Sequence, residues 1–182
     1  MIKFIAYGDI FSISGISCYA HGCNCAGAMG KGIALQFKKR FPQMYLQYRK
    51  KCLQNQFHPG DVFEFVQGTQ RIYNLGTQKT WRTNATLEAI ELSVRKMLKL
   101  ATEQHVKDIA MPKIGAGLGG LPWEDVKLLL QQLAMEYPTV NLIVVENYKL
   151  NSSYKCNGIH INNLFKFFVW CEVSKSFTRS II

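Results

Sequence analysis

Glycine-rich turns between strand-like and helix-like segments constrain this chain more than any other feature of its sequence. "MPKIGAGLGGLPWEDV", residues 111–126, ends an apolar run, passes through four glycines and opens a helical stretch with Pro122 as its expected first residue. "HGCNCAGAMGKGIALQF", residues 21–37, also runs from a strand-like segment through glycines into a helix. Repeated strand-to-helix units predict an α/β layer fold.

The hydrophobic periodicity along the chain predicts which segments of that fold are strands and which are helices. Strands are expected at 2–7, 16–21, 61–66, 71–76, 106–112 and 140–148, and helices at 32–41, 43–53, 84–101 and from Pro122. The turn signal Gly68-Thr69 predicts an antiparallel hairpin between the third and fourth strands. The run at 140–148 is apolar and β-branched, which is typical of a buried central strand. Thr83 or Asn84 is expected to cap the helix at 84–101.

Length and charge limit the alternatives. The 182 residues, 48% of them apolar, suffice for one sizeable core. The net charge of +10 is unevenly placed, because no acidic residue occurs between Asp9 and Asp61. The basic residues of that stretch are Lys31, Lys38, Lys39, Arg40, Arg49, Lys50 and Lys51. The stretch is either a surface that attracts polyanions or a solvated helical face, and no zinc-finger or RNP-type signature decides for nucleic acid.

The sequence also indicates a compartment. Its apolar runs are shorter than the roughly 20 residues of a membrane-spanning helix, and its first residues lack the features of a signal peptide. Cys23 and Cys25 are separated by one residue, which is not the spacing of a zinc site. We therefore expect a cytoplasmic monomer without a metal, a cofactor or a membrane partner.

The glycine-rich turns predict a ligand site. Ligands of open α/β sheets bind at the carboxyl ends of the strands, where glycines let backbone N–H groups approach phosphate oxygens. Two such turns suit a diphosphate, and neither has the ending of a P-loop, so nucleotide hydrolysis is not indicated. A third turn, "NLGTQKTW" at 74–81, brings Lys79 to the same edge, either as an exposed loop lysine or as a functional group.

These motifs together carry a family resemblance. "YGDI" at 7–10, "AHGCNCAGAMGKGIALQFKKRFP" at 20–42 and the turns at 74–81 and 111–126 resemble the macrodomain family, an ADP-ribose-binding fold. Within it they are similar to the branch of the terminal ADP-ribose glycohydrolase and the DNA de-ADP-ribosylating antitoxin DarG. The resemblance covers about residues 1–149 and implies a three-layer α/β/α domain with a central mixed sheet. Residues 150–182 are then a C-terminal extension of unknown role.

The resemblance implies where ADP-ribose binds. Asp9 accepts a hydrogen bond from the adenine amino group, with Ile10 and Tyr148 nearby, and Asn24 lies beside the distal ribose. His21 stands where many macrodomains have an asparagine, and it either reaches the ribose or is a structural histidine. The other implied contacts are Met29, Gly30, Lys31, Gly32, Ile33 and Thr77, with Ile114, Gly115, Ala116, Gly117, Leu118 and Gly119 in the second phosphate loop.

The resemblance further implies a reaction. Lys79 matches the catalytic lysine of this branch, which removes ADP-ribose from a modified macromolecule without a metal. DNA or RNA bases are the favoured substrates and acidic side chains come next. Gly119 stands where the terminal glycohydrolase has an aspartate, so release by that carboxylate is not expected. The alternatives are an ADP-ribose 1''-phosphate phosphatase using His21 or Asn24, a non-catalytic reader of ADP-ribose, and a scaffold with an occluded pocket.

Overall fold

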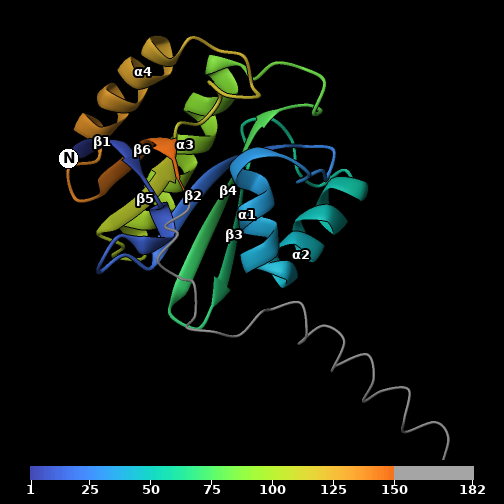
Figure 1. Cartoon of the computed structure of the whole chain (residues 1–182), viewed down its shortest axis with the longest axis horizontal. Helices are drawn as coiled ribbons and strands as arrows, with labels where there is room; N and C mark the ends of the chain where they lie inside the picture. Colours follow the sequence, from blue (N-terminus) through green and yellow to red (C-terminus); the bar gives the residue numbers. More distant parts are fainter. Residues whose placement is uncertain (150–182) are drawn as a thin grey trace, which may run out of the picture. The chain divides into compact units, whose positions relative to one another are not determined.

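The computed structural model describes residues 1–149, so the predicted extension lies outside the described residues. The described chain forms a six-stranded sheet with two helices on each face (Figure 1). Its elements are β1 (Ile2–Gly8), the 3-10 helix η1 (Ile10–Ser12), β2 (Cys18–Asn24), α1 (Gly32–Arg40), α2 (Pro42–Leu53), β3 (Val62–Gln67), β4 (Gln70–Gln78), α3 (Leu87–Glu103), β5 (Asp108–Pro112), α4 (Trp123–Glu136) and β6 (Asn141–Tyr148).

The sheet is mixed, as expected. Its strand order is β1-β6-β5-β2-β4-β3. Every neighbouring pair is parallel except β3 and β4, which form the predicted antiparallel hairpin. β6 lies between β1 and β5, which confirms that the apolar run near 140–148 is an interior strand. The parallel strands deliver their carboxyl ends to one edge of the sheet, where ligands of such folds bind.

Two apolar cores show that the domain has three layers. Val144 of β6 packs in the core under α3 and α4, whereas Val145 packs in the core under α1 and α2. In β4, Tyr73 packs in the core under α3 and α4, and Ile72 packs in the core under α1 and α2. Successive residues of a strand point to opposite faces, so helices must cover both sides of such a sheet. The α1–α2 side is aromatic, with Phe37 completely buried.

The start of α3 differs from the prediction. Thr86, and not Thr83 or Asn84, caps the helix, because its side chain accepts a hydrogen bond from the Ala89 N–H. The residues before it are held in other contacts: the Ala85 N–H donates to the Gly119 carbonyl at 2.8 Å. Because of this tertiary hydrogen bond to the second glycine loop, the helix begins after the first residue that could have capped it.

The other helix boundaries fall close to those expected. α1 ends at Arg40 and α2 restarts at Pro42, with the buried Phe41 between them. α4 begins at Trp123, so Pro122 is its N-cap and not its first helical residue. Within residues 1–149, the structure contains no helix with the length and apolar character needed to cross a bilayer.

Candidate functional site

Two adjoining cavities lie where β2, β4 and β5 end. The larger has a volume of about 410 Å³ and is lined by Gly22, Cys23, Asn24, Ala28, Met29, Gly30, Lys31, Ala34, Gln78, Trp81 and Leu118. The smaller has about 250 Å³ and is lined by Gly22, Lys31, Gly32, Ile33, Ala34, Thr77, Gln78, Pro112, Lys113, Ile114, Gly115, Gly117, Leu118 and Gly119. Lys31, Gln78 and Leu118 are among the residues that border both, so the two cavities are neighbours and are together called the cleft below.

Asn24 shapes the first glycine loop. Its Oδ1 accepts from the Ala26 and Ala28 N–H groups at 3.0 and 3.2 Å, and its Nδ2 donates to the Ala28 carbonyl at 2.6 Å. The Tyr48 hydroxyl donates to the Asn24 carbonyl at 2.5 Å from helix α2. Asn24 lies at the wall of the larger cavity, and its side-chain amide already holds the loop that leads to α1.

The N-terminus of α1 faces the smaller cavity. Lys31 is the N-cap residue and makes no side-chain capping bond, and Gly32, with φ of +59°, begins the helix. Both residues line the smaller cavity. The first helical N–H groups and the helix dipole make such a terminus favourable for anions, and Lys31 adds a positive charge beside it.

Gly119 in the second glycine loop has no room for a side chain. A Cβ at this position would lie 2.5 Å from the Gly115 carbonyl oxygen and 3.0 Å from the Ala85 Cβ. The backbone of the loop and the start of α3 therefore approach each other through Gly119. An aspartate here would require the loop to move. Of the residues predicted for this loop, Ala116 lines neither cavity.

Thr77 and Gln78 connect β4 to the cleft. Thr77 is buried, lines the smaller cavity and donates from Oγ1 to the Cys23 carbonyl at 3.3 Å. Gln78 borders both cavities and donates from Nε2 to the Thr80 carbonyl at 2.9 Å. The end of β4 is thus bonded through side chains to β2 and to the turn that follows β4.

Lys79 lies at the margin of the cleft. It follows the last residue of β4, its side chain is exposed, and its carbonyl accepts from the Cys25 N–H at 3.2 Å. It is not a lining residue of either cavity, although Gln78 and Trp81 on either side of it line the larger one. Its catalytic role stays a prediction.

The residues predicted for adenine form a separate group at the ends of β1 and β6. Asp9 Oδ1 accepts from the Phe11 N–H at 2.9 Å and caps η1, and Ile10 is completely buried. Gly8 pairs with Tyr148 across the two parallel strands. Burial and the nearby Asp9 carboxylate raise the pKa of Tyr148. The structure brings these residues together but outside the lining of the two cavities.

His21 lies in the core. Its side chain is completely buried, its ring stacks on Phe37 with centroids 3.9 Å apart, and its Nε2 lies 2.9 Å from Asn74 Oδ1. Because Asn74 Nδ2 donates to the Phe63 carbonyl, Oδ1 is the acceptor and His21 Nε2 carries the proton. Burial lowers the pKa of His21 to about 4. His21 lines neither cavity, so the structure favours a structural histidine over a ribose contact.

Several lining residues were not predicted from the sequence. They are Gly22, Cys23, Ala28, Ala34, Gln78, Trp81, Pro112 and Lys113. All of them lie within the three turns singled out in the sequence, but most are small or apolar, and no chemical signal marked them individually as contacts. Trp81 did offer a signal, since it is a large aromatic residue two positions after the candidate lysine in the third strand-end turn.

Comparisons with known proteins agree with this architecture. The sequence model described as "Macro domain" matches residues 20–130. The chain is 35% identical over 159 residues to a DNA ADP-ribosyl glycohydrolase of Thermus aquaticus, covering 84% of this chain and 44% of the relative. A relative of the same name from Mycobacterium tuberculosis is 36% identical over 125 residues, which are 66% of this chain and 36% of that protein.

The solved macrodomain of Mycobacterium tuberculosis DarG superposes with a TM-score of 0.75 at 33% identity. The match covers 80% of this chain and 97% of that domain. The chain thus spans less than half the length of these two curated relatives but nearly all of the solved domain. By its sequence match and its fold, the chain belongs to the macrodomain family.

Proposed function

We propose that this chain is an ADP-ribosyl glycohydrolase that removes ADP-ribose from modified nucleic-acid bases, with acidic protein side chains as the second substrate class. The observation that carries the proposal is the meeting of two glycine loops around one cleft with the Lys79 turn at its margin. The names of the relatives, DNA ADP-ribosyl glycohydrolases, support the same reaction.

ADP-ribose fits the order of features along the sheet edge. The smaller cavity offers backbone N–H groups, the N-terminus of α1 and the side chains of Lys31 and Lys113 to a diphosphate. Adenine is proposed to extend toward Asp9 and Tyr148. The distal ribose then occupies the larger cavity near Asn24, with its anomeric carbon toward the turn that follows β4.

Few side chains near the cleft can attack the anomeric carbon. Among residues 1–149, those that line the two cavities include no Asp, Glu or His. Cys23 lines the larger cavity, but burial raises its pKa well above the usual value, so its thiol stays protonated. Lysines remain. Lys31 lines both cavities and is proposed to pair with the diphosphate, whereas Lys79 lies on the turn at the margin of the larger cavity, so we assign the attack to Lys79.

The proposed reaction proceeds through Lys79. The unprotonated amine forms a bond to the anomeric carbon while the bond from that carbon to the modified base breaks. The base leaves with the electron pair and takes up a proton. Water then cleaves the carbon–nitrogen bond of the adduct, which releases ADP-ribose and restores the amine.

Substitutions at Lys79 separate a nucleophile from a charge partner. We expect Lys79→Ala and Lys79→Arg to lower kcat at least about 100-fold with KM little changed, because neither side chain supplies an attacking amine. The control Lys31→Ala removes a positive charge from the proposed diphosphate site, and we expect it to raise KM and largely preserve kcat. Steady-state kinetics on ADP-ribosylated single-stranded DNA measures both parameters.

Other outcomes would assign other functions. Activity retained by Lys79→Arg but not by Lys79→Ala would reduce Lys79 to a charge partner. Phosphate release from ADP-ribose 1''-phosphate that does not depend on Lys79, without release from DNA, would indicate the phosphatase. Binding of ADP-ribose without turnover of any substrate would indicate a reader. A cytoplasmic location and a monomeric state stay predictions from the sequence.

A further inference from the structure

Trp81 is an exposed aromatic residue at the wall of the larger cavity. Its side chain is 58% exposed, yet it lines the cavity together with Asn24 and Met29. A single exposed apolar residue is common on protein surfaces. An exposed tryptophan bordering a proposed ligand site is different, because its ring is available to a bound molecule.

The turn that carries Trp81 is fixed by a hydrogen-bond network. The Thr80 N–H donates to Thr83 Oγ1 at 2.9 Å, and Thr83 Oγ1 donates to the Thr80 carbonyl at 3.0 Å. The Arg82 N–H donates to Thr80 Oγ1 at 3.2 Å, and Gln78 Nε2 donates to the Thr80 carbonyl at 2.9 Å. Trp81 is thus held on an ordered turn, so a ligand that contacts it does not first have to order the backbone.

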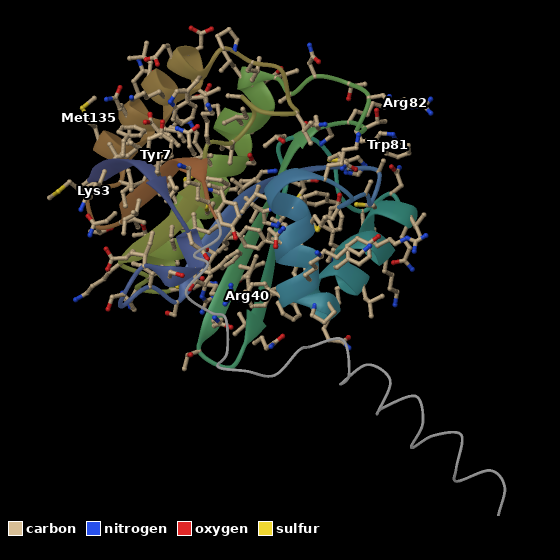
Figure 2. All side chains as sticks on the ribbon, in the orientation of Figure 1. Lys3, Tyr7, Arg40, Trp81, Arg82 and Met135 are labelled. Atoms are coloured by element: carbon tan, nitrogen blue, oxygen red, sulfur yellow. The ribbon has the colours of Figure 1, made fainter. Side chains whose placement is uncertain are left out.

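One positive charge lies beside this ring, and others lie on the loops around the same cavity. The Arg82 guanidinium carbon lies 5.9 Å from the Trp81 ring centroid, and Figure 2 shows the two residues side by side. Lys31 lines the same cavity. Arg49 of α2 packs its aliphatic part on the first loop, since a Cβ at Gly27 would lie 3.3 Å from Arg49 Cγ. An aromatic face among cations is the combination that proteins use to bind the bases and phosphates of single strands.

We propose that Trp81 is the stacking platform for the nucleobase that carries ADP-ribose, and that Arg82 accompanies the phosphates of its strand. This inference rests on the proposed function, in which the distal ribose occupies the larger cavity. The group attached to the anomeric carbon then leaves the cavity beside Trp81. A nucleobase offers a planar partner for the indole ring, whereas an acidic protein side chain does not.

The stacking platform also predicts which form of nucleic acid is accepted. A base can lie against Trp81 only when it is not stacked in a duplex, and extruding a paired base costs free energy. We therefore infer a preference for single-stranded over double-stranded substrates carrying the same modification.

Equilibrium binding tests the role of Trp81 independently of turnover. Three ligands are compared: ADP-ribose, a peptide with ADP-ribosylated glutamate, and a single-stranded oligonucleotide with one ADP-ribosylated base. All variants carry Lys79→Ala so that the ligands stay intact. We expect Trp81→Ala to weaken oligonucleotide binding by about 5- to 150-fold, the range of one base–aromatic stack, and to change the other two affinities less than about twofold. Trp81→Phe retains most of the oligonucleotide affinity.

Tyr7→Ala is the matched control. Tyr7 is 61% exposed on β1, and Figure 2 shows it on the opposite side of the view from Trp81. We expect Tyr7→Ala to leave all three affinities unchanged, because an exposed aromatic side chain away from the cavity does not contribute to binding. Equal losses for the three ligands in Trp81→Ala, or no loss for the oligonucleotide, would overturn the inference while ADP-ribose binding by the parent protein still stands. Failure of the parent protein to bind ADP-ribose would overturn the proposed function and the inference together.

Discussion

His21 illustrates how burial decides the role of a single residue. In the sequence it stands one position before a glycine at a strand end, where a ribose contact and a structural role are equally compatible. Its ring is stacked on Phe37 and bonded to Asn74 within the core. The choice between the two roles depends on packing partners that are 16 and 53 residues away, and the local sequence does not contain that information.

The buried His21 predicts a pH dependence of stability. Its pKa is about 4 in the folded protein and ordinarily about 6.5 when unfolded. Between these values the unfolded chain binds a proton that the folded protein does not, so the free energy of unfolding falls as the pH falls from 6.5 to 4 and is unaffected above that window. The loss is on the order of 3 kcal/mol.

Urea denaturation between pH 4 and pH 7 measures this dependence, and His21→Asn is expected to flatten the curve in that window. An NMR titration of the His21 ring in the folded protein provides a second measurement that does not depend on the variant folding. A titration midpoint near 6.5 would contradict the buried, neutral histidine.

The secondary-structure elements were more predictable than the loops that connect them. Periodicity identified the strands and helices, including the hairpin at Gly68 and the break before Pro42, because each depends on residues that are close in the sequence. The start of α3 was wrong by several residues because Ala85 is bonded to Gly119, which lies in a distant loop. Trp81 was missed as a lining residue although its place in the Lys79 turn was a local signal, and only the other loops show that a cavity lies beside it.

The second glycine loop carries a prediction with an internal control. Gly119→Ala is expected to lower the melting temperature, because the new Cβ would lie 2.5 Å from the Gly115 carbonyl oxygen. Gly117→Ala adds the same methyl group two residues away, where no heavy atom lies within 4 Å, and is expected to leave the melting temperature almost unchanged. Thermal denaturation of both variants would refute the packing described here if the two losses were equal.

At the scale of the whole molecule, the basic stretch between Asp9 and Asp61 is either a surface that attracts polyanions or a solvated helical face. Lys38, Arg40 and Lys51 lie over the rings of Tyr45, Phe11 and Phe63, so part of the basic stretch covers aromatic surface. The basic residues also fall in the last turns of α1 and α2, where they complement the helix dipoles. Lys39 and Lys50 are exposed and make no ion pair or aromatic contact within residues 1–149, which leaves them available to a polyanion.

The salt dependence of binding to single-stranded DNA distinguishes a polyanion-binding surface from a solvated helical face. We expect Lys39→Gln/Lys50→Gln to weaken binding of unmodified single-stranded DNA and to reduce the slope of log affinity against log salt by up to about 1.4, the value for two phosphate contacts. The control Lys99→Gln/Lys107→Gln removes the same charge from exposed positions on α3 and just before β5. Equal effects of the two double variants would show that only the net charge matters, and would favour a solvated helical face over a polyanion-binding surface.

We propose that Lys79 cleaves the bond between ADP-ribose and a nucleobase. The most direct measurement incubates the wild-type protein and Lys79→Ala with single-stranded DNA carrying ADP-ribose on thymidine and follows free ADP-ribose over time. We predict release by the wild type and almost none by Lys79→Ala, with both proteins binding ADP-ribose equally well. Equal release by the two proteins, or no release by the wild type despite ADP-ribose binding, would contradict the claim.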